Sequence, residues 1–382
     1  MSVTRRKMMF LVGGGAILAA GGAFGYAATR TPKSAYLPWE QAGSHADPRM
    51  RALSWALLAP NPHNRQPWLA DLTEPGIVTL HADTARLLPH TDPYNRQITI
   101  GLGCFLELLR MAAAEDGYRV DMTLFPQGSN VAGLDQRPCA RVAFTADPEV
   151  EPDPLFARVL DRRSNKEPFD TNRRVDPAIP ARLGAVVRSG TRFGGTVDPT
   201  EVGQWRELTH TALRIEVETP RTYQESVDLF RIGRHEVDAN PDGIDFIGPL
   251  FETLRLTGQF SRAAASDTSS FAYKSGLDAI FANTDTAMGH VWLITGDNSR
   301  ETQMAAGADW LRVNLAATAE GLGFQPLSQA LQEFPEMAGP YGQVHERLAP
   351  TGGTVQMLAR IGYGPEVGRS PRWALETRIM NV

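Results

Sequence analysis

The spacing of apolar residues divides the chain into helices and strands. Apolar side chains recur every three to four positions over residues 47–58, and this period predicts an amphipathic helix. The almost wholly apolar segment that begins at Ile98 runs to about Glu115 and stops before Gly117, which predicts a buried central helix. Residues 76–83 and 119–125 alternate between apolar and polar positions, as half-buried strands do. The pattern therefore predicts an α+β fold.

Two helical segments resemble each other. Residues 103–117 and 307–321 both run from one glycine to another. Each places a large apolar residue, Met111 or Leu315, immediately before two alanines. We interpret this repeat as an internal duplication, in which two α+β halves of one chain form a pseudo-dimer.

The two halves are predicted at residues 46–150 and 155–368, with a C-terminal tail at 369–382. The second half contains a stretch at 220–290 that has helical pieces and few strand signals. This stretch is longer than a connection between packed elements needs to be. We therefore expect a lid-like insertion that covers a site.

The N-terminal segment, residues 1–28, differs from the rest of the chain. Arg5 and Arg6 are followed by an apolar run rich in glycine and alanine, and the segment ends in small residues. This three-part pattern is typical of an export signal, and the paired arginines indicate the twin-arginine export machinery. The apolar run is also close to membrane-spanning length, so a signal-anchor is the alternative. We expect a periplasmic or membrane-anchored protein, with cleavage of the signal left open.

Composition narrows the possible functions. The chain has 382 residues and 42% apolar residues, enough for a large core or two lobes. Its net charge of −5 argues against nucleic acid as a partner. Two cysteines form no disulfide framework, and the apolar surroundings of Cys104 predict a buried thiol rather than a reactive one. The acidic stretch 233–245 is interpreted as a solvated loop, so no metal site is predicted.

Four motifs carry a resemblance to a known family. They read APNPHNRQPW at 59–68, RRSNKEPFD at 162–170, GLGFQPLSQ at 321–329 and ARIGYGPEVGRSPR at 359–372. The first resembles the Ala-Pro-Ser-x-x-Asn-x-Gln-Pro-Trp loop of nitroreductase-type flavoproteins, and the second resembles their Arg-x-Ser-x-Arg/Lys opening. The third resembles the segment that passes over the flavin ring, and the fourth resembles the Gly-Tyr-…-Pro-Arg ending. The closest resemblance is to the fused-half, Acg-type branch of this family, which carries a twin-arginine signal.

The resemblance implies a nitroreductase-like fold and an FMN cofactor. The FMN phosphate calls for guanidinium groups, and the candidates are Arg162, Arg369 and Arg372. Ser164 and Asn64 are the candidates for the ribityl chain. Lys166 follows Ser164 by two positions on an extended segment, so both side chains point the same way, and its ammonium suits the N1–O2 edge of the ring.

The resemblance also assigns the residues at flavin N5 and in the opening loop. The backbone N–H of Ser328 or Gln329 is expected at N5, although the family more often has an acidic residue and glycine there. Gln66 is expected to brace the loop and Trp68 to anchor it in the core, while His63 is either a hydrogen-bonding strut or a catalytic acid. The remaining flavin-contacting residues are expected to be Pro60, Asn61 and Pro62 in the loop, and Pro326 and Leu327 before Ser328.

The motifs predict one FMN for each chain, because each occurs only once. The leading hypothesis is an FMN-dependent oxidoreductase with ping-pong kinetics, a small-molecule donor and a quinone- or nitroaromatic-like acceptor. The alternative is an FMN storage or sequestration protein with a lidded site and no turnover. A third hypothesis is a structural, membrane-anchored protein that binds no cofactor. A monomer is favoured, because internal pairing removes the usual reason to dimerise.

Overall fold

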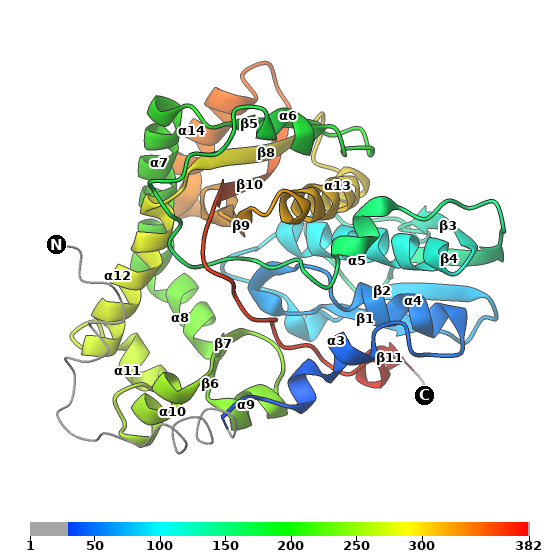
Figure 1. Cartoon of the computed structure of the whole chain (residues 1–382), viewed down its shortest axis with the longest axis horizontal. Coiled ribbons are helices and arrows are strands. Elements are labelled where there is room, and N and C mark those ends of the chain that lie inside the picture. Colours follow the sequence, from blue (N-terminus) through cyan, green and yellow to red (C-terminus); the bar gives the residue numbers. More distant parts are fainter. Residues whose placement is uncertain (1–29, 381–382) are drawn as a thin grey trace.

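A computed structural model describes residues 30–380, so the predicted export signal at 1–28 lies outside the described residues. The fold mixes helices with three sheets, as the α+β prediction requires (Figure 1). The first sheet has the strand order β11-β1-β2-β4-β3, the second has the order β5-β8-β10-β9, and β6 pairs with β7. The strands are β1 Trp68–Asp71, β2 Ile77–Ala82, β3 Tyr118–Leu124, β4 Pro138–Ala146, β5 Arg192–Thr196, β6 Phe230–Ile232, β7 Ile244–Phe246, β8 Gly289–Thr295, β9 Gly323–Pro326, β10 Thr354–Gly362 and β11 Ile379–Met380.

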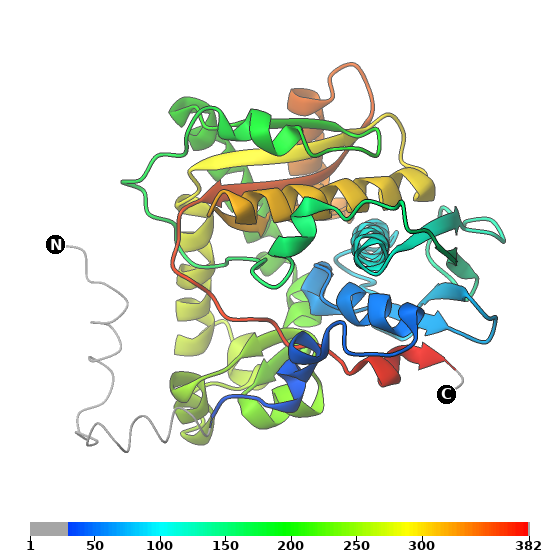
Figure 2. The same ribbon diagram turned by 45° about the vertical axis from the view of Figure 1, so that its right-hand side comes forward.

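The helices surround and separate the two larger sheets. They are α3 Leu37–Gln41, α4 Pro48–Ala56, α5 Arg96–Glu115, α6 Ile179–Gly184, α7 Pro199–Glu218, α8 Pro220–Asp228, α9 Arg234–Ala239, α10 Pro249–Leu256, α11 Arg262–Ser266, α12 Phe271–Asp285, α13 Arg300–Ala319 and α14 Ala338–Leu348. Helix α13 lies against the second sheet, and α5 lies between α13 and the first sheet (Figure 2).

The elements predicted for the first half are confirmed. Asp47 caps α4, because its side chain accepts a hydrogen bond from the backbone N–H of Arg49. Strand β2 covers the alternating segment at 76–83, and β3 alternates half-buried and exposed residues. Helix α5 ends at Glu115, and Gly117 follows with a φ of +74°, a conformation that glycine adopts without strain.

Helices α5 and α13 cross at two glycines of the sequence repeat. A Cβ on Gly103 would lie 2.2 Å from the backbone oxygen of Met304, and a Cβ on Gly307 would lie 2.0 Å from that of Ile100. Gly103 thus approaches the residue three positions before Gly307, and Gly307 approaches the residue three positions before Gly103. Contacts of this reciprocal kind occur where two equivalent elements meet at a two-fold axis. The crossing is therefore what a duplicated helix pair would form.

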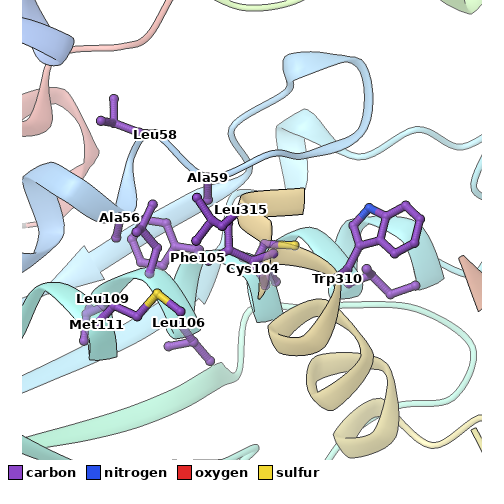
Figure 3. Close-up of a cluster of buried hydrophobic side chains, with 14 of the residues drawn as sticks. Ala56, Leu58, Ala59, Cys104, Phe105, Leu106, Leu109, Met111, Trp310 and Leu315 are labelled. Atoms are coloured by element: carbon purple, nitrogen blue, oxygen red, sulfur yellow. The ribbon is translucent and has the colours of Figure 1, made fainter. Parts of the chain in front are cut away.

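The core is built around this crossing. Figure 3 shows Phe105 and Cys104 of α5 beside Leu315 of α13 and beside Ala59, which follows α4. Cys104 is buried, as predicted, and burial raises the pKa of its thiol to about 12. Among residues 30–380, α5 alone is long and apolar enough to cross a membrane, but its packing in this core accounts for its apolar character.

The C-terminal segment connects the two larger sheets. The chain after β10 runs back across the molecule to β11, which pairs in parallel with β1 (Figure 1). The C-terminal tail predicted at 369–382 therefore completes the first sheet. Residues 220–290 form α8 to α12 with the short strands β6 and β7, at the lower left of Figure 1.

Candidate functional site

The loop after α4 holds an unusual backbone conformation. His63, Asn64 and Gln66 have φ values of 47°, 50° and 51°. Non-glycine residues seldom adopt this left-handed region, and they stay there only where their surroundings hold them. The loop must therefore be fixed by contacts outside itself.

Gln66 supplies much of this support. Its backbone N–H donates to Asn61 Oδ1 at 2.7 Å. Its Nε2 donates to the backbone oxygen of Pro241 in the insertion at 2.7 Å, and its Oε1 accepts from the backbone N–H of Trp373 at 2.9 Å. The predicted brace is confirmed, and it reaches the insertion and the C-terminal segment at once. Trp68 is buried with its ring centroid 4.8 Å from that of Phe105, so it anchors the loop in the core as predicted.

Asn64 binds the C-terminal segment. Its Oδ1 accepts from Arg372 Nη1 at 2.8 Å, and its Nδ2 donates to the backbone oxygen of Pro371 at 3.0 Å. Arg372 Nε also donates to the backbone oxygen of Leu57 at 2.8 Å. In this structure, the amide expected at the ribityl chain therefore ties the loop of the first half to the end of the second.

Four guanidinium groups gather beside this loop, and we call them the arginine cluster: Arg162, Arg163, Arg369 and Arg372. Among residues 30–380, none of the four lies within ion-pair distance of a carboxylate. Arg162 is 3% exposed and donates to the backbone oxygen of Leu58 at 3.0 Å. Burial lowers the pKa of Arg162 to about 10. Burial and the neighbouring charge of Arg162 lower the pKa of Arg372 to about 9. The cluster is therefore a positive region, buried at Arg162 and Arg372 and half-buried at the other two arginines, that an anion would stabilise.

Ser164 and Lys166 are both exposed, whereas Asn165 between them is buried. This alternation agrees with the predicted extended segment. The backbone N–H of Asn165 donates to the backbone oxygen of Phe324 at 2.9 Å, which places the segment alongside β9. Within the described part of the chain, Lys166 has no hydrogen-bond or ion-pair partner.

Electrostatic interactions place Lys166 near both the loop and the insertion. Burial, together with the charges of Lys166 and Arg65, lowers the pKa of His63 to about 4. Burial raises the pKa of Asp245 in β7, while Lys166 and Arg372 oppose that rise. The loop of the first half, the Arg-Ser-Lys segment of the second and the insertion therefore converge on one region, which we call the candidate site.

The segment predicted at flavin N5 borders β9. Pro326 ends β9 opposite Ala359 of β10, and the backbone N–H of Leu327 donates to the backbone oxygen of Leu358 at 2.8 Å. A short 3₁₀ turn, Ser328–Leu331, follows. No acceptor for the backbone N–H of Ser328 or Gln329 lies among residues 30–380, as expected for the first residues of such a turn. These two donors are available to a bound group.

The insertion is fastened to the loop by Asp242. Its Oδ2 accepts from Arg65 at 3.2 Å and from Arg86 at 2.6 Å, and its Oδ1 accepts from Arg231 Nη2 at 2.8 Å. The backbone N–H of Gly243 donates to the backbone oxygen of Asn64 at 3.3 Å. We call this set of bonds the Asp242 latch.

The interpretation of 233–245 as a solvated loop is wrong. The stretch contains α9 and part of β7, and Asp242 is 4% exposed, because the folding of the insertion turns its carboxylates toward arginines and backbone N–H groups. Within residues 30–380, no three His, Cys, Asp or Glu side chains are grouped so that they could hold a metal ion.

One part of the site was not predicted from the sequence. Residues 34–41 precede the predicted start of the first half, yet they form a 3₁₀ turn and α3 that pack beside the arginine cluster. Trp39 of α3 lies under three of the four guanidinium groups. No local signal marks these residues, because their role depends on contacts with a segment more than 300 positions away.

Comparison with known proteins supports the resemblance. No family model matches the chain. A protein of Mycobacterium tuberculosis named "Putative NAD(P)H nitroreductase acg" is 26% identical over 330 residues, covering 84% of this chain and 90% of that protein. The uncharacterized protein Rv3127 of the same species is 30% identical over 126 residues, covering 31% of this chain and 35% of that protein. The resemblance that the motifs indicated, to the Acg-type branch, is therefore confirmed at the level of sequence.

Two solved structures are distant matches to this chain. The FMN-dependent nitroreductase NfnB from Mycobacterium smegmatis aligns with a TM-score of 0.32 and 15% identity, covering 55% of this chain and 91% of that chain. The nitroreductase-like family protein from Bacillus cereus aligns with a TM-score of 0.32 and 12% identity, covering 61% of this chain and 97% of that chain. TM-scores in this range do not establish a shared arrangement of the whole chain.

Proposed function

We propose that this chain, a relative of acg over 84% of its length, is an FMN-dependent oxidoreductase of the nitroreductase type. The observation that carries the proposal is the convergence of Lys166 and the arginine cluster on the loop of the other half, without carboxylate partners among the described residues. Cations that lack an ion-pair partner suit a ligand that carries a phosphate dianion and an electron-accepting ring.

The residues of the site fit the parts of FMN. Arg162, with four of its five N–H donors unbound by other described residues, would hold the phosphate with Arg369 and Arg372. Lys166 would lie at the N1–O2 edge, and Ser164 would bind the ribityl chain. The unpaired backbone N–H groups of Ser328 and Gln329 would bind at N5. The loop residues Pro60, Asn61, Pro62 and Asn64, with Pro326 and Leu327, would border the ring.

The side chains bind and orient, and none is required as a strong acid. When bound, FMN supplies two-electron redox chemistry that no side chain here offers. The ammonium of Lys166 would favour negative charge at the edge of a bound ring. His63 is uncharged at neutral pH, because its pKa is lowered to about 4, so it is not the proton donor at that pH.

We further propose ping-pong kinetics, in which a small-molecule donor and then a quinone- or nitroaromatic-like acceptor use the same site. The single copy of each motif supports one site for each chain. The internal packing of α5 on α13 supports a monomer. Export by the twin-arginine route, to the periplasm or a membrane anchor, rests on the sequence of residues 1–28.

A second function, FMN storage or sequestration, is favoured by the Asp242 latch. The buried carboxylate of Asp242 joins three arginines, and the insertion also bonds to the strained loop. An insertion fastened in this way over a bound ligand would slow the exchange of that ligand. A storage protein would keep its FMN and show no turnover.

Anaerobic reduction of the purified protein separates the two functions. An oxidoreductase is expected to lose its flavin absorbance on addition of NADH, NADPH or a quinol, and to regain it with a quinone or nitroaromatic compound. Loss of absorbance with dithionite alone supports storage or an electron donor that was not added. In a storage protein, Asp242→Asn should speed FMN release. A colourless protein that does not bind added FMN contradicts both functions.

A further inference from the structure

Trp39 lies in the centre of the arginine cluster. It belongs to α3, outside the four motifs that indicated the flavin site. The carbon atoms at the centres of the Arg163, Arg369 and Arg372 guanidinium groups lie 5.2, 5.5 and 5.5 Å from its ring centroid. The indole is 3% exposed, and its Nε1 donates to the backbone oxygen of Ser370 at 2.8 Å.

The segment that carries Trp39 is held at both ends. The backbone N–H of Arg372 donates to the backbone oxygen of Ala35 at 2.9 Å. Asp238 of the insertion accepts from the backbone N–H of Lys33 at 2.9 Å, from Ser34 Oγ at 2.9 Å and from the backbone N–H of Ala35 at 3.2 Å. Residues 33–41 are therefore fixed between the insertion and the C-terminal segment.

The indole ring of Trp39 holds together three guanidinium groups that would otherwise move apart. Three guanidinium groups repel one another, and no carboxylate of the described chain forms an ion pair with them. The negative face of an indole attracts each cation without neutralising it. Arg369 has no hydrogen-bond acceptor among residues 30–380, so its donors remain free for an anion. A ring in this place keeps the cluster together and still able to bind an anion.

We propose that Trp39 is a positioning residue for the phosphate of FMN, which gathers Arg163, Arg369 and Arg372 into one anion site. This inference rests on the proposed function and adds to it. The residues that directly follow the predicted export signal form part of the cofactor site. A chain shortened to the predicted start of the first half at residue 46 would lack them.

The test compares the affinities of the full chain for FMN and for riboflavin, which lacks the phosphate. Wild type should bind FMN much more tightly than riboflavin. Trp39→Leu should lower this preference about tenfold while riboflavin affinity changes little. Trp39→Phe keeps a ring and should retain most of the preference. Trp55→Leu is the matched control, because Trp55 packs on Phe156, outside the arginine cluster.

Arg369→Gln provides a second variant if Trp39→Leu does not fold. This substitution removes one of the three cations that lie over the Trp39 ring, so it should also lower the preference for FMN. An unchanged preference in the folded Trp39→Leu, or in Arg369→Gln where Trp39→Leu does not fold, overturns the inference while leaving the FMN site in place. A wild-type chain that binds both flavins equally, or neither, overturns the proposed function itself.

Discussion

Lys166 is an exposed cation that forms no ion pair or hydrogen bond within the described chain. If it supports the N1–O2 edge of FMN, Lys166→Ala should weaken FMN binding about tenfold or more, because charged hydrogen bonds contribute about 1.5–3 kcal/mol. The flavin potential should also become more negative. Fluorescence titration and equilibration with redox dyes measure the two effects.

Two variants control this prediction. Lys166→Arg keeps the charge and should retain most of the affinity. Lys274→Ala removes an exposed lysine of α12 and should change neither quantity. If Lys166→Ala has wild-type affinity and potential, Lys166 does not have its assigned role.

Glu216 should make stability depend on pH. Burial raises its pKa from 4.5 to about 7, while Gln332 Nε2 donates to its Oε2 at 2.8 Å. Between pH 4.5 and about 7, the folded state binds more protons than the unfolded state, so the free energy of unfolding falls as pH rises through this window. Glu216→Gln should lose this dependence.

Denaturant unfolding at about pH 5 and about pH 8 measures the effect. Relative to wild type, Glu216→Gln should be more stable at the higher pH than at the lower one. Glu346→Gln, an exposed carboxyl in α14, serves as the control. An equal difference between Glu216→Gln and wild type at both pH values would refute the assignment.

At the scale of elements, the crossing of α5 and α13 tolerates no side chain at its two glycines. Gly307→Ala would put a methyl group 2.0 Å from the backbone oxygen of Ile100, so the helices would have to separate. Overpacking of this kind costs about 1–3 kcal/mol or more. Urea unfolding should show this loss for Gly307→Ala, and a similar loss for Gly103→Ala.

Gly203→Ala in α7 is the matched control. No atom lies within 4 Å of the Cβ it would add, so this substitution should stabilise the helix by about 0.5–1 kcal/mol. If both crossing variants are as stable as wild type, the close approach of α5 and α13 is not a requirement of the fold.

The elements predicted correctly from the sequence are those with a clear local pattern of apolar and polar residues. The apolar period gave α4 and α5, alternation gave β2 and β3, and the turn-rich loop with its terminal Trp68 was correctly expected to be anchored in the core. Motif residues of the loop and of the later motifs also lie near one another, as the bond between Asn64 and Arg372 shows. These features depend on neighbours within a few positions or on the family resemblance.

The rest depends on pairs of residues that are far apart along the chain. The parallel pairing of β11 with β1 joins Ile379 to Ala70, and neither segment signals the other. Likewise, Trp39 gains its role from Arg369 and Arg372, and the carboxylate of Asp242 is buried only because Arg65 and Arg86 surround it. Contacts of this range follow from the fold, and no local pattern encodes them.

For the whole molecule, the central claim is that one chain forms one FMN site from both of its halves. Calorimetric titration of the cofactor-free protein with FMN tests this claim most directly. We expect one FMN for each chain, with affinity lowered both by Asn64→Ala in the first half and by Lys166→Ala in the second. Two FMN molecules for each chain, or a single site that only one of these substitutions weakens, would contradict the account.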